Sequence, residues 1–420
     1  MSALDQTLAD PKSLRPASPQ TLTEARATAV DAAPVSNPNT RSTILPRLSY
    51  ADDMPQLITD ARDRFETAKV LGRGGVGEVV LARDNDIERP VAVKRLLPEF
   101  DDPGIIGRFV DEIRVLGALD HPNIVPIHDV GIDPDGRYYY VMKYVEGETL
   151  EHVIERLQAG DREYHARYPF ERRMEVFRQV LRGVQYAHAR GVIHRDIKPA
   201  NVMVGRYGEV LLMDWGIARR LHEDEQKRFP VRDSVATLKA PRASKESPRL
   251  RTVIGELIGT PAYMSPEQAR GDNHKLDERS DVYSLCVMFH ELLTLRHYLG
   301  HTETVSQCLI GAQKEEVPVA YTITSEHQPV VPADLAHFIR HGVSKNPAER
   351  YRSVTVMLDR LQAVEEGHCP VECPATMMKR MGTETTHAID RHPFVLLGAV
   401  SVTLVLALLG VAMLVVSAVM

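Results

Sequence analysis

The stretch from residue 194 to residue 201 reads His194-Arg195-Asp196-Ile197-Lys198-Pro199-Ala200-Asn201. This short segment holds three groups of different chemistry. Asp196 is a carboxylate that can orient an attacking hydroxyl and accept its proton, Asn201 supplies an oxygen ligand for a metal ion, and Lys198 adds positive charge. Transfer of a phosphoryl group to a hydroxyl needs all three. The alternative is an ordinary polar loop that combines these groups by chance. The combination favours phosphoryl transfer with Asp196 as the catalytic base.

A glycine-rich run lies upstream, between two segments that read as strands. It reads Gly72-Arg73-Gly74-Gly75-Val76-Gly77-Glu78-Val79. Glycines let backbone N–H groups approach phosphate oxygens closely, because no side chain stands in the way. A dinucleotide-binding turn has similar glycines but opens a helix, whereas residues 79–82 continue as a strand. A plain glycine-rich turn is the other alternative. We expect a hairpin that covers phosphates.

The next strand, Val91-Ala92-Val93-Lys94, resembles the V-A-I-K strand of protein kinases. Over residues 65–365 the chain resembles the bacterial branch of eukaryotic-like (Hanks-type) Ser/Thr protein kinases. The resemblance implies an α+β, two-lobed protein-kinase fold with ATP and Mg²⁺ in the cleft. Lys198 resembles the Ser/Thr branch of the family rather than the tyrosine branch. Two alternatives stay open: a pseudokinase scaffold that binds nucleotide without transferring phosphate, and a small-molecule kinase of related fold.

The resemblance also implies roles for individual residues. Lys94 is expected to hold the α- and β-phosphates and to join Asp196 and Lys198 in catalysis, positioned by Glu112 on the following helix. Asp111 competes with Glu112 for that role, and an inconsequential surface ion pair is the alternative. Asn201 and Asp214 are the expected Mg²⁺ ligands. The residues expected around the nucleotide are Leu71, Gly72, Arg73, Gly74, Gly75, Val76, Gly77, Val79, Ala92, Lys94, Glu112, Met142, Lys143, Val145 and Met203. Leu71, Val79, Ala92 and Met203 also read as ordinary core residues.

Trp215 departs from the family pattern. In Asp214-Trp215-Gly216 it replaces the usual phenylalanine, while the metal-binding carboxylate and the glycine are kept. Metal binding is expected to survive. The larger ring leaves open how this segment switches between active and inactive arrangements.

Further residues are implied to be supports rather than catalysts. Two of them lie in Gly259-Thr260-Pro261-Ala262-Tyr263-Met264-Ser265-Pro266-Glu267, which has Ser where the family commonly has Ala. The others are Asp281, at the start of an apolar helix, and the last residue of Asn346-Pro347-Ala348-Glu349-Arg350. Thr260 is expected to contact the catalytic loop. Glu267 is expected to pair with Arg350, and Asp281 to brace the catalytic loop.

The activation segment, residues 214–267, is unusually long and rich in Lys, Arg, Ser and Thr. In this family an arginine at the position of Arg195 receives a phosphate from the segment, so the resemblance implies regulation by phosphorylation. Thr252 is the best-placed acceptor. A solvated loop with incidental hydroxyl groups is the alternative.

The rest of the chain divides by composition. Residues 1–62, rich in Ala, Pro, Ser and Thr, read as a disordered arm. The kinase domain is expected at 63–365, with the N-lobe at 63–144 and the C-lobe at 145–365. A juxtamembrane linker is expected at 366–392, where Cys369, Cys373 and His368 make a poor metal site. The formal net charge of -6 argues against a nucleic-acid partner. Protein substrates and the membrane are the expected partners, and a homodimer is left open.

A transmembrane helix is expected at residues 393–420. No charged residue occurs in 394–420, and at about 1.5 Å per residue such a helix can cross a hydrocarbon core of about 30 Å. Lys379, Arg380 and Arg391 precede it, which predicts a cytoplasmic kinase domain at the cell membrane. A buried core helix and a removable lipid-anchor signal are the alternatives.

Overall fold

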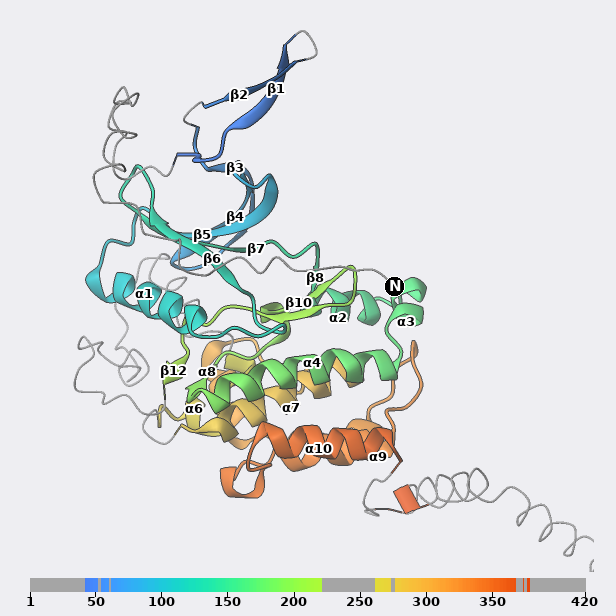
Figure 1. Ribbon diagram of the computed structural model, residues 1–420. Helices are drawn as coiled ribbons and strands as arrows, with labels where there is room; N and C mark the ends of the chain where they lie inside the picture. Colours follow the sequence, from blue (N-terminus) through green and yellow to red (C-terminus); the bar gives the residue numbers. More distant parts are fainter. Residues whose placement is uncertain are drawn as a thin grey trace, which may run out of the picture.

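The computed structural model describes residues 42–51, 54–59, 62–220, 261–272, 276–367, 373 and 376–377. Within these residues a β-rich lobe lies above a helical lobe, as Figure 1 shows. The expected two-lobed α+β architecture is therefore confirmed. The predicted membrane span at 393–420 and Thr252 lie outside the described residues. Among the helices of the described part, none is both long and apolar enough to span a bilayer.

The N-lobe is built on a five-stranded antiparallel sheet in the order β3-β4-β5-β7-β6. Its strands are β3 (Phe65–Arg73), β4 (Gly77–Asp84), β5 (Arg89–Leu96), β6 (Ile127–Ile132) and β7 (Tyr138–Lys143). The glycine-rich run is the turn of the β3–β4 hairpin. Register then places Lys94 opposite Val79 on β4 and opposite Tyr140 on β7. Lys94 thus lies in the middle of the sheet, close behind the glycine turn.

One helix, α1 (Pro103–Gly117), packs against this sheet. It begins at Asp102, whose side chain accepts hydrogen bonds from the N–H groups of Gly104 and Ile105 and so caps the first turn. Phe109 and Glu112 are both buried and lie three residues apart, so they share one face of the helix. The apolar packing of this face carries the Glu112 carboxylate toward the sheet.

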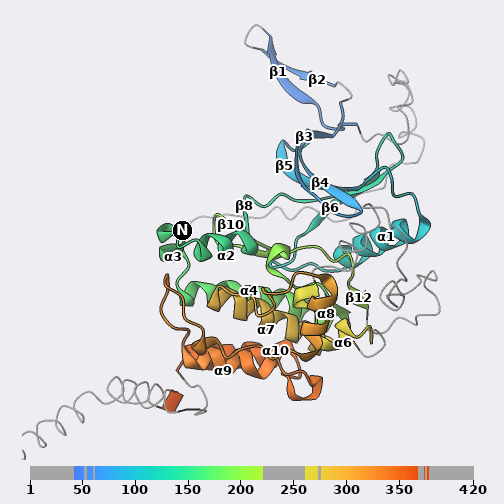
Figure 2. The same ribbon diagram turned by 180° about the vertical axis from the view of Figure 1, so that it is seen from behind.

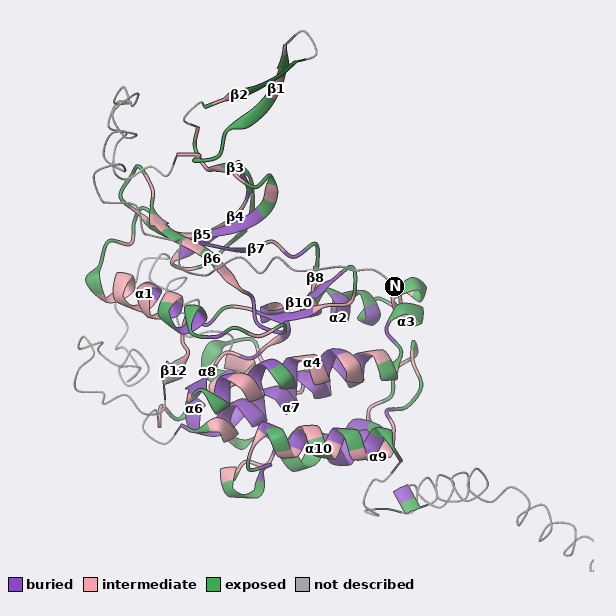
Figure 3. Ribbon diagram, viewed as in Figure 1, coloured by how far each residue is buried: buried purple, intermediate pink, exposed green. Residues whose placement is uncertain are grey.

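The C-lobe is organised around α7 (Glu278–Thr294), in which every residue from Ser280 to Thr294 is buried. Figure 3 shows α7 in the buried colour among its neighbours. α7 packs against α4 (Phe170–Ala189), where the rings of Phe177 and Phe289 stack with centroids 4.0 Å apart. The other helices that the structure describes in this lobe are α2 (Leu150–Gln158), α3 (Arg162–Arg167), α6 (Pro266–Ala269), α8 (Val305–Lys314), α9 (Ala333–Gly342) and α10 (Val354–Glu365).

Short strands and single turns carry the chain past the junction of the lobes. The strands are β8 (Gly147–Thr149), β9 (Val192–Ile193), β10 (Val202–Gly205), β11 (Val210–Leu212) and β12 (Arg219–Arg220). The 3₁₀ turns are η3 (Pro199–Asn201), η5 (Pro261–Tyr263), η7 (Ala320–Thr322) and η8 (Pro347–Glu349). The segment 194–201 runs from β9 through η3, directly before β10. The catalytic-loop residues predicted from the sequence thus lie between two strands that hold both ends of the loop.

Residues 47–51 and 54–58 differ from the disordered arm expected for 1–62. They form an antiparallel hairpin of β1 (Arg47–Ala51) and β2 (Met54–Ile58), which stands clear of the N-lobe in both views (Figures 1 and 2). Leu48 pairs with Leu57 and Tyr50 with Pro55, which puts apolar side chains on one face of the ribbon. This short alternation was hidden by the polar residues around it. For this part of the arm the structure has paired strands where the sequence predicted disorder.

Candidate active site

A cavity of about 850 Å³ opens between the lobes. Its upper wall is the glycine-rich turn and β5, and its lower wall is the catalytic loop and the start of the activation segment. Predicted site residues that line it are Gly72, Arg73, Gly74, Gly75, Val76, Gly77, Val79, Lys94, Glu112, Met142, Asp196, Lys198, Asn201 and Asp214. Residues far apart in the sequence therefore meet in one cleft.

Lys94 is held by two carboxylates at the top of this cleft. Its Nζ lies 2.6 Å from Oε1 of Glu112 and 3.2 Å from Oδ1 of Asp214. The competing Asp111 is half-exposed and pairs with Arg114 instead. Burial alone would lower the pKa of Lys94, but Asp214 and Glu112 outweigh burial and raise this pKa well above its ordinary range. The ammonium group is therefore charged at every physiological pH.

Asp214 is kept ionised by the same arrangement. The charge of Lys94, working against burial, lowers the pKa of Asp214 to about 2. Asp214 has φ = 55°, in the left-handed region that costs a non-glycine residue on the order of 1–3 kcal/mol. Strain of this kind is typical of sites where the backbone must aim a functional group. Here it turns the carboxylate toward Lys94.

Asp196, the predicted base, is bound by its two predicted neighbours in the loop. Lys198 Nζ lies 2.8 Å from Asp196 Oδ2, and the Asn201 side-chain amide donates to the same oxygen at 3.1 Å and to the Asp196 carbonyl at 2.9 Å. Burial raises the pKa of Asp196, although Lys198 opposes the shift. Because the Asn201 side-chain nitrogen donates to Asp196, the side-chain oxygen of Asn201 is the atom that can bind a cation.

The loop backbone is anchored from below by Asp281. Its Oδ2 accepts from the His194 N–H at 2.8 Å and its Oδ1 from the Arg195 N–H at 2.9 Å, while the His188 ring lies 2.7 Å from Oδ2. The Asp281 side chain is fully buried near the N-terminus of α7. The structure thus places Asp281 where the sequence expected a brace, and the rigid α7 core supports it.

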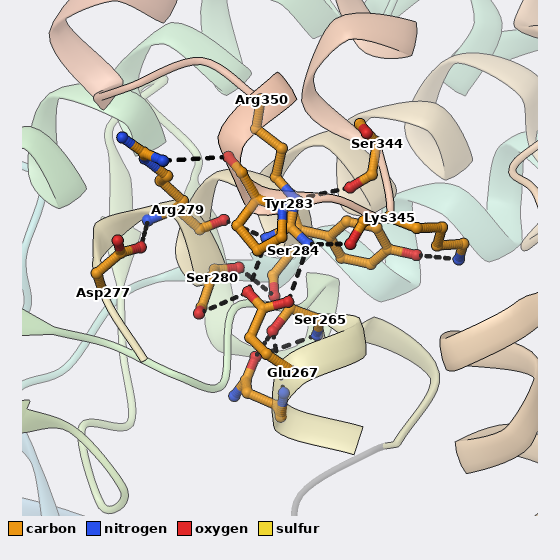
Figure 4. A network of polar contacts seen from close by, with 12 residues as sticks. Ser265, Glu267, Asp277, Arg279, Ser280, Tyr283, Ser284, Ser344, Lys345 and Arg350 are labelled. Carbon is orange, nitrogen blue, oxygen red and sulfur yellow. Dashed lines mark hydrogen bonds and ion pairs between the residues drawn. The ribbon is translucent and has the colours of Figure 1, made fainter. Parts of the chain in front are cut away.

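Glu267 and Arg350 form the second expected support, shown in Figure 4. Two parallel hydrogen bonds of 2.7 and 2.9 Å join the Arg350 guanidinium to the Glu267 carboxylate, which also accepts from Ser280 Oγ at 2.8 Å. Burial opposes ionisation, but the hydrogen bonds from Arg350 and Ser280 keep the pKa of Glu267 below its ordinary value. The Arg350 side chain is 0% exposed and that of Glu267 is 5% exposed, so this ion pair is almost completely withdrawn from water.

Trp215 lies beneath the catalytic loop. Its ring is 1% exposed and its centroid is 4.4 Å from that of His194, at an interplanar angle of 53°. Among the described residues, none accepts a hydrogen bond from the indole N–H, although this group is buried. Burial also lowers the pKa of His194, so the ring under which Trp215 packs is neutral. The substituted aromatic residue therefore belongs to the packed base of the site.

Five residues expected around the nucleotide do not line the cavity. Ala92 and Val145 are buried in packing, Met203 is half-buried in β10, and Leu71 and Lys143 are exposed. For these five, contact with the nucleotide stays a prediction. The cavity itself extends under the glycine turn toward α1, which contributes Ile105, Arg108 and Phe109 to its lining. Lining residues that the sequence reading missed are Leu96, Ile105, Arg108, Phe109, Tyr140, Glu151, Ala200, Met213, Gly216, Ile217 and Pro261.

Tyr140 matters most among the missed residues. Its hydroxyl donates to Glu112 Oε1 at 2.8 Å, and so it orients the carboxylate that holds Lys94. The register of β5 and β7 puts Tyr140 directly opposite Lys94, a signal that a strand alignment could have provided. Thr260, expected to contact the catalytic loop, lies outside the described residues.

The two-lobed fold and the groups in its cleft are those of the protein kinase class. The chain belongs to the protein kinase domain family, whose model matches residues 65–360. It is 32% identical over 320 residues to the serine/threonine-protein kinase PknD of Protochlamydia amoebophila, and 34% identical over 321 residues to the serine/threonine-protein kinase PknB of Mycobacterium tuberculosis. Each match covers 75% of this chain, but 31% of that PknD and 45% of that PknB. The expected resemblance to bacterial Hanks-type kinases is confirmed, and this chain spans less than half the length of these relatives.

Proposed function

We propose that this chain is an ATP-dependent protein kinase that transfers the γ-phosphoryl group to Ser or Thr hydroxyls of proteins. One observation carries the proposal: Asp196, bound to Lys198 and Asn201, faces the same cavity as the Lys94–Glu112–Asp214 cluster. A carboxylate base thus lies across one cleft from charged groups suited to phosphates. The names of both bacterial relatives support Ser and Thr as the acceptors.

The residues at the roof of the cleft fit a nucleotide. A Cβ added at Gly72 would meet no atom within 4 Å, and one at Gly74 would meet only the Gly77 carbonyl oxygen, at 3.7 Å. The space beside these backbone groups is therefore open to phosphate oxygens. Gly77 is needed for a different reason, since a Cβ there would lie 2.9 Å from the Arg95 carbonyl oxygen.

The donor set at the floor fits Mg²⁺. Asp214 stays ionised down to a pH of about 2, and Asn201 offers an amide oxygen, so both are hard oxygen ligands. When bound, Mg²⁺ would neutralise charge on the phosphate oxygens. Asp214 and Asn201 are the residues that would hold it.

Each of the chain's own residues in the cleft then has a separate role in phosphoryl transfer. Asp196 orients the substrate hydroxyl and takes its proton as the oxygen attacks the γ-phosphorus, and the bond to the β-phosphate oxygen breaks. Lys198, 2.8 Å from Asp196, places positive charge beside the transferred group. Lys94 draws the α- and β-phosphates toward the roof, and Glu112 with Tyr140 keeps it in place.

Transfer of labelled phosphate from ATP to a general protein substrate tests this proposal, with hydrolysis and phosphoamino-acid analysis of the product. We expect the label on serine or threonine. The rate is expected to fall at least about 100-fold in Asp196→Asn, because this substitution removes the base. Nucleotide binding without any transfer would favour the pseudokinase scaffold. Transfer only to a small molecule would favour the third alternative.

We also propose that residues 393–420 anchor the chain in the cell membrane with the kinase domain on the cytoplasmic side. The uncharged run and the preceding basic residues support this. Fractionation of cells that express the full chain or a chain ending at residue 392 tests it. We expect the full chain with the membranes and the shorter chain in the soluble fraction. Equal distribution of the two would contradict the anchor.

Finally, we propose that phosphorylation of Thr252 controls activity. The support is the sequence position of Thr252 in the activation segment and of Arg195 before the catalytic Asp. Mass spectrometry of the active chain is expected to find phosphate on Thr252, and treatment with phosphatase to reduce the rate. If Thr252→Ala changes neither phosphate incorporation nor specific activity, the assignment fails.

A further inference from the structure

The backbone that carries the catalytic base needs support from outside the loop. Arg195, directly before Asp196, has φ = 70°, in the left-handed region that L side chains disfavour. Asp281 holds one side of this residue by accepting from its N–H at 2.9 Å. The other side is the peptide group between Arg195 and Asp196, and a different residue holds it.

That residue is Gln268. Its Nε2 donates to the Arg195 carbonyl oxygen at 2.8 Å, while the N–H of the same peptide group, that of Asp196, donates to His194 Nδ1 at 3.2 Å. Both polar groups of this peptide are therefore bonded. Because the peptide plane sets the direction in which Asp196 leaves the backbone, a contact to its carbonyl also bears on the base.

The Gln268 amide is itself oriented by Ser265. Gln268 Oε1 accepts from the Ser265 N–H at 3.1 Å and from Ser265 Oγ at 3.0 Å, which leaves Nε2 as the atom that faces Arg195. Ser265 is 0% exposed and Gln268 7% exposed. Ser265 stands where the family commonly has alanine, and its hydroxyl supplies one of these two bonds.

We propose that Gln268 is a positioning residue for the catalytic base, which couples the Ser265-Pro266-Glu267 segment to Asp196 through the Arg195 carbonyl. The inference rests on the proposed phosphotransfer and adds to it. Gln268 does not line the cavity. It acts through the peptide that carries Asp196, and not on the nucleotide.

Gln268→Met in the full chain tests the proposal, since methionine has a similar length but no N–H donor. We expect kcat to fall at least about tenfold, because small misplacements of a reacting group have effects of this size or larger. The KM for ATP is expected to stay within about twofold, because the Lys94–Glu112 pair and the glycine turn are not touched.

Gln313→Met is the matched control. Gln313 Nε2 donates to the carbonyl oxygen of Ala269 at 3.0 Å, so it binds the same helix α6 but makes no bond to the catalytic loop. Its kcat is expected to be unchanged. An equal loss in both variants would mean that α6 is merely weakened, and would overturn the proposal, as would a normal kcat in Gln268→Met.

Gln268→Glu provides a second test, the pH dependence of kcat, which a purely structural role of Gln268 would not change. One carboxyl oxygen can still accept from Ser265, and the other then faces the Arg195 carbonyl. When ionised it repels this carbonyl, and when protonated it can donate to it; burial favours the protonated form. The ratio of variant to wild-type kcat is therefore expected to rise severalfold from about pH 8 to about pH 6. A ratio independent of pH contradicts the role, whether or not Gln268→Met folds.

The two proposals fail in different ways. A wild-type chain that transfers no phosphate to protein overturns the proposed function and this inference together. An active wild-type chain with normal kinetics in Gln268→Met and a pH-independent ratio in Gln268→Glu overturns the inference alone.

Discussion

Lys94 Nζ lies 2.6 Å from Glu112 Oε1, and this contact joins the central strand β5 to the helix α1. Glu112 has only 4% of its side chain exposed and also accepts from the Tyr140 hydroxyl. An ion pair so well withdrawn from water is sensitive to the loss of either partner. The pair also reports the position of α1, since Glu112 can reach Lys94 only when the helix is packed against the sheet.

Glu112→Gln is expected to reduce kcat/KM for ATP by about 10- to 100-fold, because Lys94 then leans toward Asp214 and its ammonium is misplaced. Steady-state phosphate transfer at varied ATP concentration measures the effect. Asp111→Asn is the matched control, as this neighbouring carboxylate is half-exposed and its ion-pair partner among the described residues is Arg114. Equal kinetics in the two variants would show that Glu112 does not position Lys94.

The acid limb of the pH–rate profile is expected to report Asp196. Because burial raises the pKa of this carboxyl, the base form is present above that pKa and is lost as the pH falls through it. Lys198 opposes the shift, so Lys198→Met is expected to move the acid limb of kcat to higher pH as well as lowering its plateau. Phosphate transfer, stopped at several times and repeated at closely spaced pH values, measures the midpoint of this acid limb.

Lys314→Met provides the control for that profile, because this lysine is exposed on α8 and is not part of the cavity lining. Its acid limb is expected to match that of the wild type. A midpoint that stays in place in Lys198→Met would contradict the role of Lys198 in tuning Asp196.

Glu267→Gln is expected to lower the free energy of unfolding by about 3–5 kcal/mol, because the buried Arg350 guanidinium loses its counter-charge. Ser280→Ala, which removes one hydrogen bond to the same carboxylate, is expected to cost about 1 kcal/mol. Urea unfolding measures both. A loss under about 1 kcal/mol in Glu267→Gln would show that the ion pair does not support the fold.

The same pair predicts a pH dependence of stability. The pKa of Glu267 is depressed in the folded chain, so its contribution is complete above the unfolded pKa of about 4.3 and is lost as the pH falls through the folded value. The wild type is therefore expected to lose stability below about pH 4.3 more steeply than Glu267→Gln.

The sequence allowed the catalytic loop to be predicted because its chemistry is local. Asp196, Lys198 and Asn201 lie within a few residues of one another, so their meeting needs no knowledge of the fold. Lys94 and Glu112 could be joined only through the family resemblance, and the structure brings them to 2.6 Å.

Contacts that depend on strand register or on a single rotamer were not predicted from the sequence. Tyr140 faces Lys94 because of the β5–β7 register, and Gln268 reaches Arg195 across 73 positions of the chain. The Leu48–Leu57 hairpin was missed because its alternation is short and is surrounded by polar residues. Val145 and Ala92, expected around the nucleotide, have buried side chains, and their contact with the nucleotide stays a prediction.

Trp215→Phe is expected to change the free energy of unfolding by less than about 2 kcal/mol. The smaller ring loses apolar contact beside His194, but it also removes a buried indole N–H that has no acceptor among the described residues, which relieves about 1–3 kcal/mol. Trp215→Ala has no such compensation and is expected to cost about 3–5 kcal/mol. Unfolding followed by circular dichroism compares all three chains, because Trp215 is the only tryptophan and its emission is lost in both variants. If the two variants lose equal stability, the indole N–H makes a favourable hydrogen bond. Trp215 then stabilises the catalytic loop through this bond as well as through the packing of its ring.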